Sequence, residues 1–357
     1  MDRTTIESWS TELWMALFEY FDVLELYNQF NGLNSRIDHI IQLTNNLCLK
    51  IDKTNHIQYL ENIMPWIRCE NVQSLTFSDD SKKYPETEFF LLYPLEKFTQ
   101  LQSFIFQGWS LPFHNPREVI EQLPNLTQLQ KLDVELHEFP QDNYEDNNTR
   151  LMELIFNSSD NLRKSLKHVV MNMYIGERTL PLVTFLPTNI EYFQANVIDL
   201  EPFLELIPSL VPCCKTIKFN YLEVNNGEEV MSSSLNVLNC CTKLTLKTNC
   251  YFKSHHFEVL LRHFPEVKRL FIDNISADDQ LTTEELEVLI RDHWPKLLQF
   301  ELISRNYLYG DDHIWKEFSQ PKFWSKGNVG SINYRTGWKL QFDRSIDNFI
   351  DSSSDDE

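Results

Sequence analysis

A three-residue apolar pattern with the spacing i, i+3, i+5 recurs along most of this chain. The middle residues of the pattern are Leu75, Phe104, Leu132, Val169, Phe193, Ile217, Leu244, Leu270, Phe300 and, more weakly, Ile332. They follow one another at intervals of 24 to 37 residues. A period in this range is typical of chains built from stacked units, each a strand and its crossover connection. Neighbouring units bury the apolar surface that a single unit would leave exposed.

A second apolar cluster, at helical spacing, lies upstream of several of these patterns. Because 42% of the chain is apolar, the triplet alone arises by chance at about 7% of positions. The upstream clusters are Leu60, Ile63, Met64 and Ile67; Phe203, Leu206, Ile207 and Leu210; and Phe257, Leu260, Leu261 and Phe264. Ile207 precedes Ile217 by 10 residues, and Leu261 precedes Leu270 by 9. This constant offset predicts an α/β fold, an open curved solenoid with inner parallel strands and outer helices over residues 43–343.

Two of these units carry a family resemblance. Residues 126–134 (LTQLQKLDV) and 267–272 (VKRLFI) resemble leucine-rich repeats in their LxxLxL core. That family usually places Asn or Cys five residues after the middle leucine, and here only Asn249 conforms. The resemblance implies a leucine-rich-repeat-like solenoid, and we expect irregular turns after its strands.

Residues 1–42 lack the strand pattern and show three short helical patterns instead. The apolar clusters of these patterns are Leu13, Leu17 and Phe21; Val23, Leu26, Tyr27 and Phe30; and Ile37, Ile40 and Ile41. Asp22 followed by Glu25 is typical of a helix start, and Gly32 of a helix end. The sequence therefore predicts a compact three-helix module.

Residues 12–41 (ELWMALFEYFDVLELYNQFNGLNSRIDHII) resemble an F-box. The resemblance implies that the module binds the adaptor subunit of an SCF-type cullin-RING ubiquitin ligase. The residues expected to form its core and adaptor face, two roles that the sequence does not separate, are Glu12, Leu13, Leu17, Tyr20, Phe21, Leu26 and Phe30. The family usually opens with Leu-Pro where this chain has Trp9 and Ser10, a departure at the adaptor interface. The alternative interpretation is a helical cap that covers the open edge of the solenoid.

Alternate residues of the expected strands face away from the core, so these positions are candidates for binding. Lys218, Lys243, Lys247 and Arg269 occupy such positions on three neighbouring strands. One interpretation is a site for an acidic or phosphorylated segment of a target protein, where cations form charge-assisted hydrogen bonds. The other is that exposed strand positions are commonly charged and the four cations have no special role.

The motifs that carry catalysis are missing from this sequence. Only eight glycines are present, and neither a phosphate-binding glycine motif nor a zinc-protease motif occurs. His255, His256 and His263 flank an amphipathic helix, where we expect solvated side chains rather than metal ligands. Cys214 and Cys241 occupy the first position of successive strand patterns and are interpreted as small apolar core residues. We therefore expect no enzyme activity, no metal and no cofactor.

The charge of the chain limits its partners. The net charge is −20, which argues against binding nucleic acid, whose phosphates require cations. No run of apolar residues is long enough to span a membrane and no signal-peptide core is present, so we expect a cytoplasmic or nuclear protein without a membrane partner. Residues 344–357 are predicted to be an acidic disordered tail, in which Ser352, Ser353 and Ser354 each precede an acidic residue by three positions, as in sites of acidophilic kinases.

These patterns lead to one functional hypothesis with alternatives. The chain is expected to be the substrate-recognition subunit of an SCF-type ligase, with the adaptor and cullin as partners and an unidentified target protein on the solenoid. The first alternative is a leucine-rich-repeat interaction scaffold with a helical cap and no ligase recruitment. The second is an enzyme whose site lies on the inner strand face.

Overall fold

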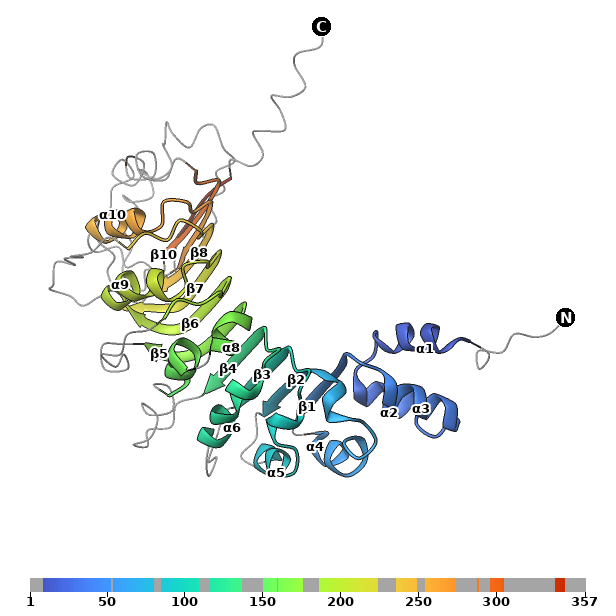
Figure 1. Cartoon of the computed structure of the whole chain (residues 1–357). Coiled ribbons are helices and arrows are strands. Elements are labelled where there is room, and N and C mark those ends of the chain that lie inside the picture. Colours follow the sequence, from blue (N-terminus) through green and yellow to red (C-terminus); the bar gives the residue numbers. More distant parts are fainter. Residues whose placement is uncertain are drawn as a thin grey trace, which may run out of the picture. The chain divides into compact units, whose positions relative to one another are not determined.

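The computed structural model describes residues 9–52, 54–79, 85–108, 116–136, 150–158, 160–175, 186–223, 236–248, 254–273, 288, 296–304 and 338–343 (Figure 1). The chain forms two compact units, Met1–Asn172 and Met173–Glu357. The described part is an α/β structure. Among its helices, none combines the length and apolar character needed to cross a membrane.

The first unit begins with three helices, α1 (Thr11–Phe18), α2 (Val23–Phe30) and α3 (Ser35–Leu43). Each helix begins after a polar residue whose side chain accepts a hydrogen bond from the first turn, as helix starts require. These residues are Ser10, Asp22 and Asn34. Asp22 and Glu25 form a reciprocal capping box. The region therefore contains three short helices, and the second starts at the Asp22 cap that the sequence indicates.

Five parallel strands follow in chain order: β1 (Leu47–Asp52), β2 (Val72–Asp79), β3 (Ser103–Gly108), β4 (Lys131–Leu136) and β5 (His168–Ile175), which ends beyond the unit boundary. The described helical segments between them are α4 (His56–Gln58), a π-helical turn (Tyr59–Ile63), a 3₁₀ turn (Cys69–Asn71), α5 (Pro85–Leu92), a 3₁₀ turn (Leu95–Lys97), α6 (Pro116–Gln122), a 3₁₀ turn (Leu123–Asn125), a second π-helical turn (Leu154–Ser158) and α8 (Asp160–Ser165). Each of β1 to β4 pairs with the strand that follows it in sequence.

The register of these strands follows the apolar pattern. Leu75 is the Cα partner of Phe104, which pairs with Leu132, and Leu132 pairs with Val169. All four side chains are buried. The buried side chains face the helices, as shown by the rings of Phe77 on β2 and Phe89 on α5, whose centroids lie 5.4 Å apart. The predicted alternation of strand and helix is therefore confirmed in this unit.

Strand β1 was missed by the pattern, although it lies inside the predicted solenoid. Leu49 and Ile51 pair with Leu75 and Phe77 and are buried. The first position of the pattern is Asn46, whose backbone has a φ of 72°, in the left-handed region that Asn tolerates better than most residues. A sharp turn therefore replaces the apolar residue that begins the later units.

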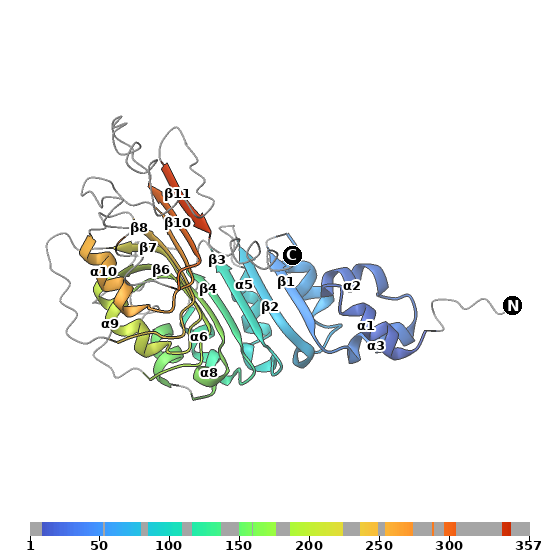
Figure 2. The same ribbon diagram turned by 90° about the horizontal axis from the view of Figure 1, so that it is seen from above.

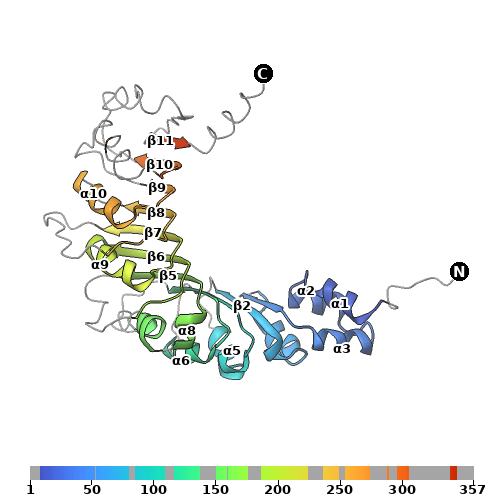
Figure 3. The same cartoon turned by 45° about the horizontal axis from the view of Figure 1, so that its top comes forward.

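The second unit repeats this arrangement. Its strands are β6 (Tyr192–Asp199), β7 (Thr216–Glu223), β8 (Lys243–Thr248), β9 (Arg269–Asp273), β10 (Gln299–Ser304) and β11 (Trp338–Asp343), and its described helices are α9 (Leu200–Leu210) and α10 (Ser254–His263). Strands β6 to β10 are parallel and pair in chain order. Figure 3 shows α9 and α10 on the same side of these strands. Phe203 of α9 packs against Phe219 of β7, with ring centroids 4.9 Å apart.

The last strand differs from the expectation. Strand β11 pairs with β10 in the antiparallel direction, so the run of parallel strands does not continue to residue 343 (Figure 2). The antiparallel direction cannot be recognised from an apolar pattern because both directions alternate with period two. The weak pattern around Ile332 and the predicted tail at 344–357 lie outside the described residues.

Cysteine and histidine positions settle two smaller expectations. Cys214 and Cys241 are fully buried, as expected for core positions. His256 and His263 are also buried, so the expectation of solvated histidines was wrong for these two. His263 lies within hydrogen-bonding distance of the Val259 carbonyl, 2.8 Å from Nδ1, which shows how a histidine one turn along a helix can be accommodated in the core.

Candidate functional site

A hollow of about 220 Å³ lies on the strand face of the second unit, over β8, β9 and β10. It is lined by Lys243, Leu244, Thr245, Arg269, Leu270, Phe271, Gln299, Phe300 and Glu301. Along each strand the leucine or phenylalanine is buried and the residues on either side are half-buried or exposed. The outward side chains therefore form two rows, because alternate residues of a strand point to opposite faces.

The register places these side chains next to one another. In the first row, Lys243 is the Cα partner of Arg269, and Arg269 is the partner of Gln299. In the second row, Thr245 pairs with Phe271, which pairs with Glu301. Two cations thus stand at one end of the hollow, and the half-buried Phe271 ring lies in the next row.

Lys243 and Arg269 are exposed, and within the described part of the chain neither side chain has an ion-pair partner. Two other lysines of this unit have ion-pair partners: Lys215 Nζ lies 2.6 Å from a Glu191 carboxylate oxygen, and Lys296 Nζ lies 2.6 Å from Glu266. Like charges directly opposite on adjacent strands are destabilising. An anion bound between Lys243 and Arg269 would relieve that repulsion.

The other two predicted target-binding cations lie outside the lining. Lys218 is the Cα partner of Thr245, and Lys247 is the partner of Asp273. The register between β7 and β8 shifts after Phe219, because three residue steps on β7 oppose two on β8. Lys218 and Lys247 do not lie opposite each other, because Lys218 is level with Thr245, two residues before Lys247. Of the four predicted residues, only Lys243 and Arg269 are direct neighbours.

Gln299 and Glu301 line the hollow, and the sequence interpretation did not include them. They flank Phe300, the middle residue of the ninth apolar pattern. Extending the alternation rule to that strand would have found both. The hollow combines two cations, an aromatic ring, an amide and one carboxylate, which suits ionic and apolar contacts with a ligand that carries negative charge.

The predicted adaptor-binding residues of the three-helix module divide into buried and exposed side chains. Leu26 is buried, together with Trp14 and Phe18, which were not among the predicted site residues. The Phe30 ring is half-buried and packs edge-on against Phe18, with centroids 5.2 Å apart. The half-buried Phe21 ring also contacts Phe30. Leu26 and Phe30 therefore contribute to the core of the module.

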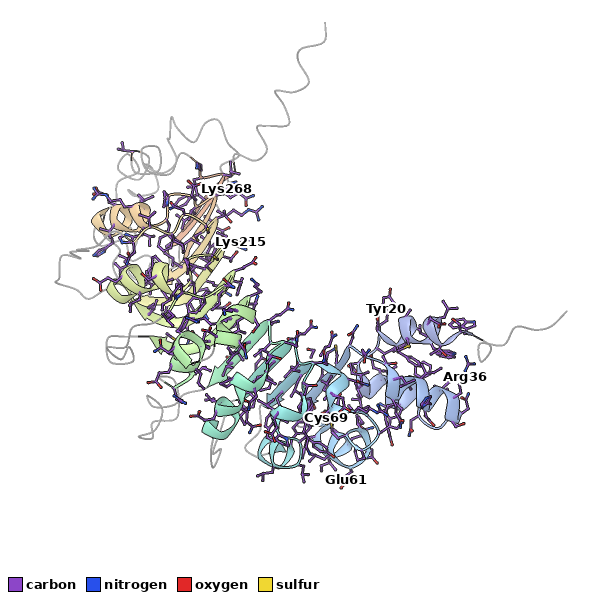
Figure 4. The ribbon with its side chains drawn as sticks, viewed as in Figure 1. Tyr20, Arg36, Glu61, Cys69, Lys215 and Lys268 are labelled. Atoms are coloured by element: carbon purple, nitrogen blue, oxygen red, sulfur yellow. The ribbon has the colours of Figure 1, made fainter. Side chains whose placement is uncertain are left out.

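Several apolar side chains of the same module are not covered by it. Leu13 has 57% of its surface exposed, Tyr20 85% and Leu33 60%, while Leu17 is half-buried. Figure 4 shows Tyr20 pointing away from the strands. Trp9 is also partly exposed, and its backbone carbonyl accepts a 2.6 Å hydrogen bond from Arg36 Nη2. These exposed side chains are candidates for contact with a partner.

The first turn of α1 is held by polar contacts. Ser10 Oγ accepts a hydrogen bond from the Leu13 amide, so this serine acts as the helix cap. Glu12 is exposed, and a backbone hydrogen bond, assisted by the Ser10 side chain, lowers the pKa of its carboxyl group. Ser10 therefore preserves the helix start, and Glu12 presents a negative charge beside Leu13.

The other side of the module contacts β1 and the turn after it. The Tyr27 ring packs edge-on against Trp66, with centroids 5.2 Å apart, and Asn28 accepts a 3.1 Å hydrogen bond from Gln58. Helix α2 thus covers the first strand unit.

The described residues contain no cluster of three or more histidine, cysteine or acidic side chains that could hold a metal ion. No protein-family model matches the chain, and no curated protein matches it either.

Proposed function

We propose that this chain is a non-enzymatic substrate receptor of an SCF-type cullin-RING ubiquitin ligase. In this proposal the three-helix module is an F-box that binds the adaptor, and the strand units form a leucine-rich-repeat-like solenoid that binds the target protein. The ligase chemistry belongs to other subunits, and the target is held at the cationic hollow.

The observation that carries the proposal is the exposed apolar surface of the module. Leu13, Tyr20 and Leu33 are more than half exposed although the module has its own buried core. Large exposed apolar side chains gain free energy when a partner covers them. The resemblance to an F-box implies that this partner is the ligase adaptor, which would present a complementary apolar surface.

The alternative is a scaffold whose module only caps the strands, and one observation favours it. Helix α2 packs on β1 and on the turn that follows, which is what a cap does. The two roles use different residues of the module. Capping uses Tyr27 and Asn28, whereas adaptor binding would use Leu13, Tyr20 and Leu33.

Co-purification of the full chain with the adaptor and cullin separates the two functions. We expect the wild-type chain to retain both subunits, and Leu13→Asp combined with Tyr20→Ala to lower adaptor recovery at least about tenfold. Asp is tolerated in the first turn of α1, where it interacts favourably with the helix dipole, so the fold should survive. Circular dichroism of the purified variant checks this.

The matched control is Leu91→Asp on α5, where another leucine is 71% exposed outside the module. We expect this variant to retain the adaptor like the wild type. If the wild-type chain retains neither adaptor nor cullin, or if Leu91→Asp reduces recovery as much as the module variant, ligase recruitment through this surface is rejected and the scaffold remains.

Target binding is tested in the second unit. Lys243→Glu with Arg269→Glu should abolish retention of target proteins identified by affinity purification and mass spectrometry. Lys218→Glu with Lys247→Glu makes the same change of charge at neighbouring positions outside the hollow. We expect this control to have a smaller effect, because screening weakens charges that do not contact the ligand. Equal losses would show that only the overall charge matters, and unchanged retention in both would reject the site.

A further inference from the structure

The direction of β11 makes an acidic segment of the same chain, residues 344–357, a candidate ligand for the cationic hollow. Asp343, the last residue of β11, is the Cα partner of Gln299, and Gln299 is the partner of Arg269. Because β11 is antiparallel to β10, β11 ends at the same end of the sheet at which β8, β9 and β10 begin. Lys243 and Arg269 are the first residues of β8 and β9.

The distances that follow from this register are short. Neighbouring strands lie about 4.8 Å apart, so Asp343 is about 10 Å from Arg269 and about 14 Å from Lys243. An extended chain covers about 3.4 Å per residue. An extended chain is therefore long enough to reach both cations from about the fifth residue of segment 344–357 onward.

The composition of the segment complements the hollow. Residues 344–357 contain Asp347, Asp351, Asp355, Asp356 and Glu357 against a single cation, Arg344. The segment also carries Phe349 and Ile350, whose apolar character is complementary to that of the half-buried Phe271 ring. The hollow offers the opposite charge at Lys243 and Arg269, which no described side chain neutralises through an ion pair.

We propose that segment 344–357 docks on Lys243 and Arg269 of its own chain and competes with external acidic ligands for the hollow. The docking stands on the register and charge described above, and only its regulatory consequence rests on the proposed function. A short tether produces a local concentration in the millimolar range, so weak ionic contacts suffice to keep the site largely occupied. An external target must then displace the segment.

The proposal also gives Ser352, Ser353 and Ser354 a role. Phosphorylation of each serine adds about −1.5 to −2 charges at neutral pH. Modification by an acidophilic kinase therefore tightens the docked state and makes the receptor harder to occupy.

Competition with a synthetic peptide of residues 344–357 tests the docking without any target protein. Fluorescence anisotropy measures peptide binding to the full chain and to a full-length variant with Asp351→Asn, Asp355→Asn, Asp356→Asn and Glu357→Gln. We expect the neutralised chain to bind the peptide at least about fivefold more tightly than the wild type. Adding Lys243→Glu and Arg269→Glu should remove that binding, whereas adding Lys218→Glu and Lys247→Glu should largely preserve it.

Carbodiimide cross-linking of the wild-type chain gives an independent readout. Mass spectrometry should find Lys243 joined to an acidic residue of segment 344–357, at a yield that does not depend on protein concentration and that falls at least about fivefold in 1 M NaCl, because salt screens ionic contacts. The cross-link between Lys296 and Glu266, an ion pair in this structure, serves as the internal control for the reaction.

Equal peptide affinity for the wild-type and neutralised chains would overturn the proposal. If the two chains bind the peptide equally and charge reversal at Lys243 and Arg269 abolishes this binding, the hollow binds external acidic segments but not the segment of its own chain. Absence of the Lys243 cross-link while the Lys296 control forms would also overturn it. Neither result depends on ligase recruitment or on target retention, so failure of the docking is distinguishable from failure of the proposed function.

Discussion

Arg150 holds the Glu121 carboxylate through two parallel hydrogen bonds, from Nε to Oε1 at 2.7 Å and from Nη2 to Oε2 at 2.8 Å. The two residues are 29 positions apart and join consecutive strand connections in the first unit. Two-pronged arginine–carboxylate pairs are stronger than single contacts. Because both side chains are about one-third exposed, we expect Glu121→Gln to lower the free energy of unfolding by about 1 kcal/mol, measured by denaturant titration.

The control for this pair is Glu258→Gln in the second unit. Glu258 interacts with Arg262 one helical turn along α10, and both side chains are more exposed. Pairs of this kind contribute about 0.3–0.5 kcal/mol. A loss at Glu121 no larger than that at Glu258 would contradict the stabilising role of the Arg150 contact.

The adjacent cysteine pairs should differ sharply in reactivity. Cys213 and Cys240 are exposed, whereas Cys214 and Cys241 are fully buried. Burial raises the pKa of the Cys214 thiol to about 12 and also raises that of Cys241. Because the thiolate is the reactive form, iodoacetamide at pH 8 should label the exposed member of each pair at least about 100-fold faster than its buried neighbour.

Peptide mass spectrometry over a time course measures this difference for each cysteine. Labelling in denaturant is the control, because unfolding should make adjacent cysteines react at similar rates. Comparable rates in the native protein would show that the strand starts at Cys214 and Cys241 are open to solvent.

The repeating strands could be predicted because their chemistry is local. First-position residues of the pattern such as Leu101, Leu129 and Val267 are fully buried just before their strands. The residues at i+3 and i+5 then point to the same face because strands alternate with period two. A residue that turns inward before a strand and two that follow on one face therefore leave a recognisable pattern in the sequence.

The features that could not be predicted depend on contacts between distant residues. Lys215 comes directly before β7 and Lys243 is the first residue of β8, one position further along the apolar pattern. Of these two lysines, only Lys215 meets a carboxylate within the described residues, that of Glu191. In the helical module, Leu13 and Trp14 are sequence neighbours, but the packing of three helices buries the tryptophan and exposes the leucine. Apolar spacing identifies a helical face, and it does not show which face a neighbouring helix will cover.

His168 should make the stability of the first unit depend on pH. Burial, and then the positive charge of Lys131 on the neighbouring strand, lower the pKa of this imidazole below its usual 6.5. The unfolded chain therefore binds a proton more readily than the folded one. The stabilising contribution is complete above about pH 6.5 and is lost as the pH falls through the folded-state pKa.

Urea titrations between pH 7.5 and 5.5 measure this effect. The wild-type midpoint should fall as the pH decreases, and the slope should be smaller in His168→Gln, which cannot take up a proton in this range. Lys131→Gln should also reduce the slope, because it removes one of the two causes of the shift. Identical slopes in all three proteins would show that His168 titrates normally.

Trp14 should be partly replaceable by a smaller ring. Its side chain is buried between Trp9, Phe18 and Phe30, yet Nε1 has no hydrogen-bond partner within the described residues. A buried donor without a partner costs about 1–3 kcal/mol, so its removal offsets part of the packing lost on shortening the ring. We expect Trp14→Phe to lower the free energy of unfolding by less than about 1.5 kcal/mol and Trp14→Ala by about 3–5 kcal/mol.

Phe18→Leu is the matched comparison, because Phe18 is equally buried and carries no polar atom whose removal could offset the loss of packing. Chemical denaturation of the three variants should therefore rank Trp14→Ala as the most damaging and Trp14→Phe as no worse than Phe18→Leu. If Trp14→Phe costs nearly as much as Trp14→Ala, the indole N–H contributes a hydrogen bond, and residues before position 9 become the candidates for its acceptor.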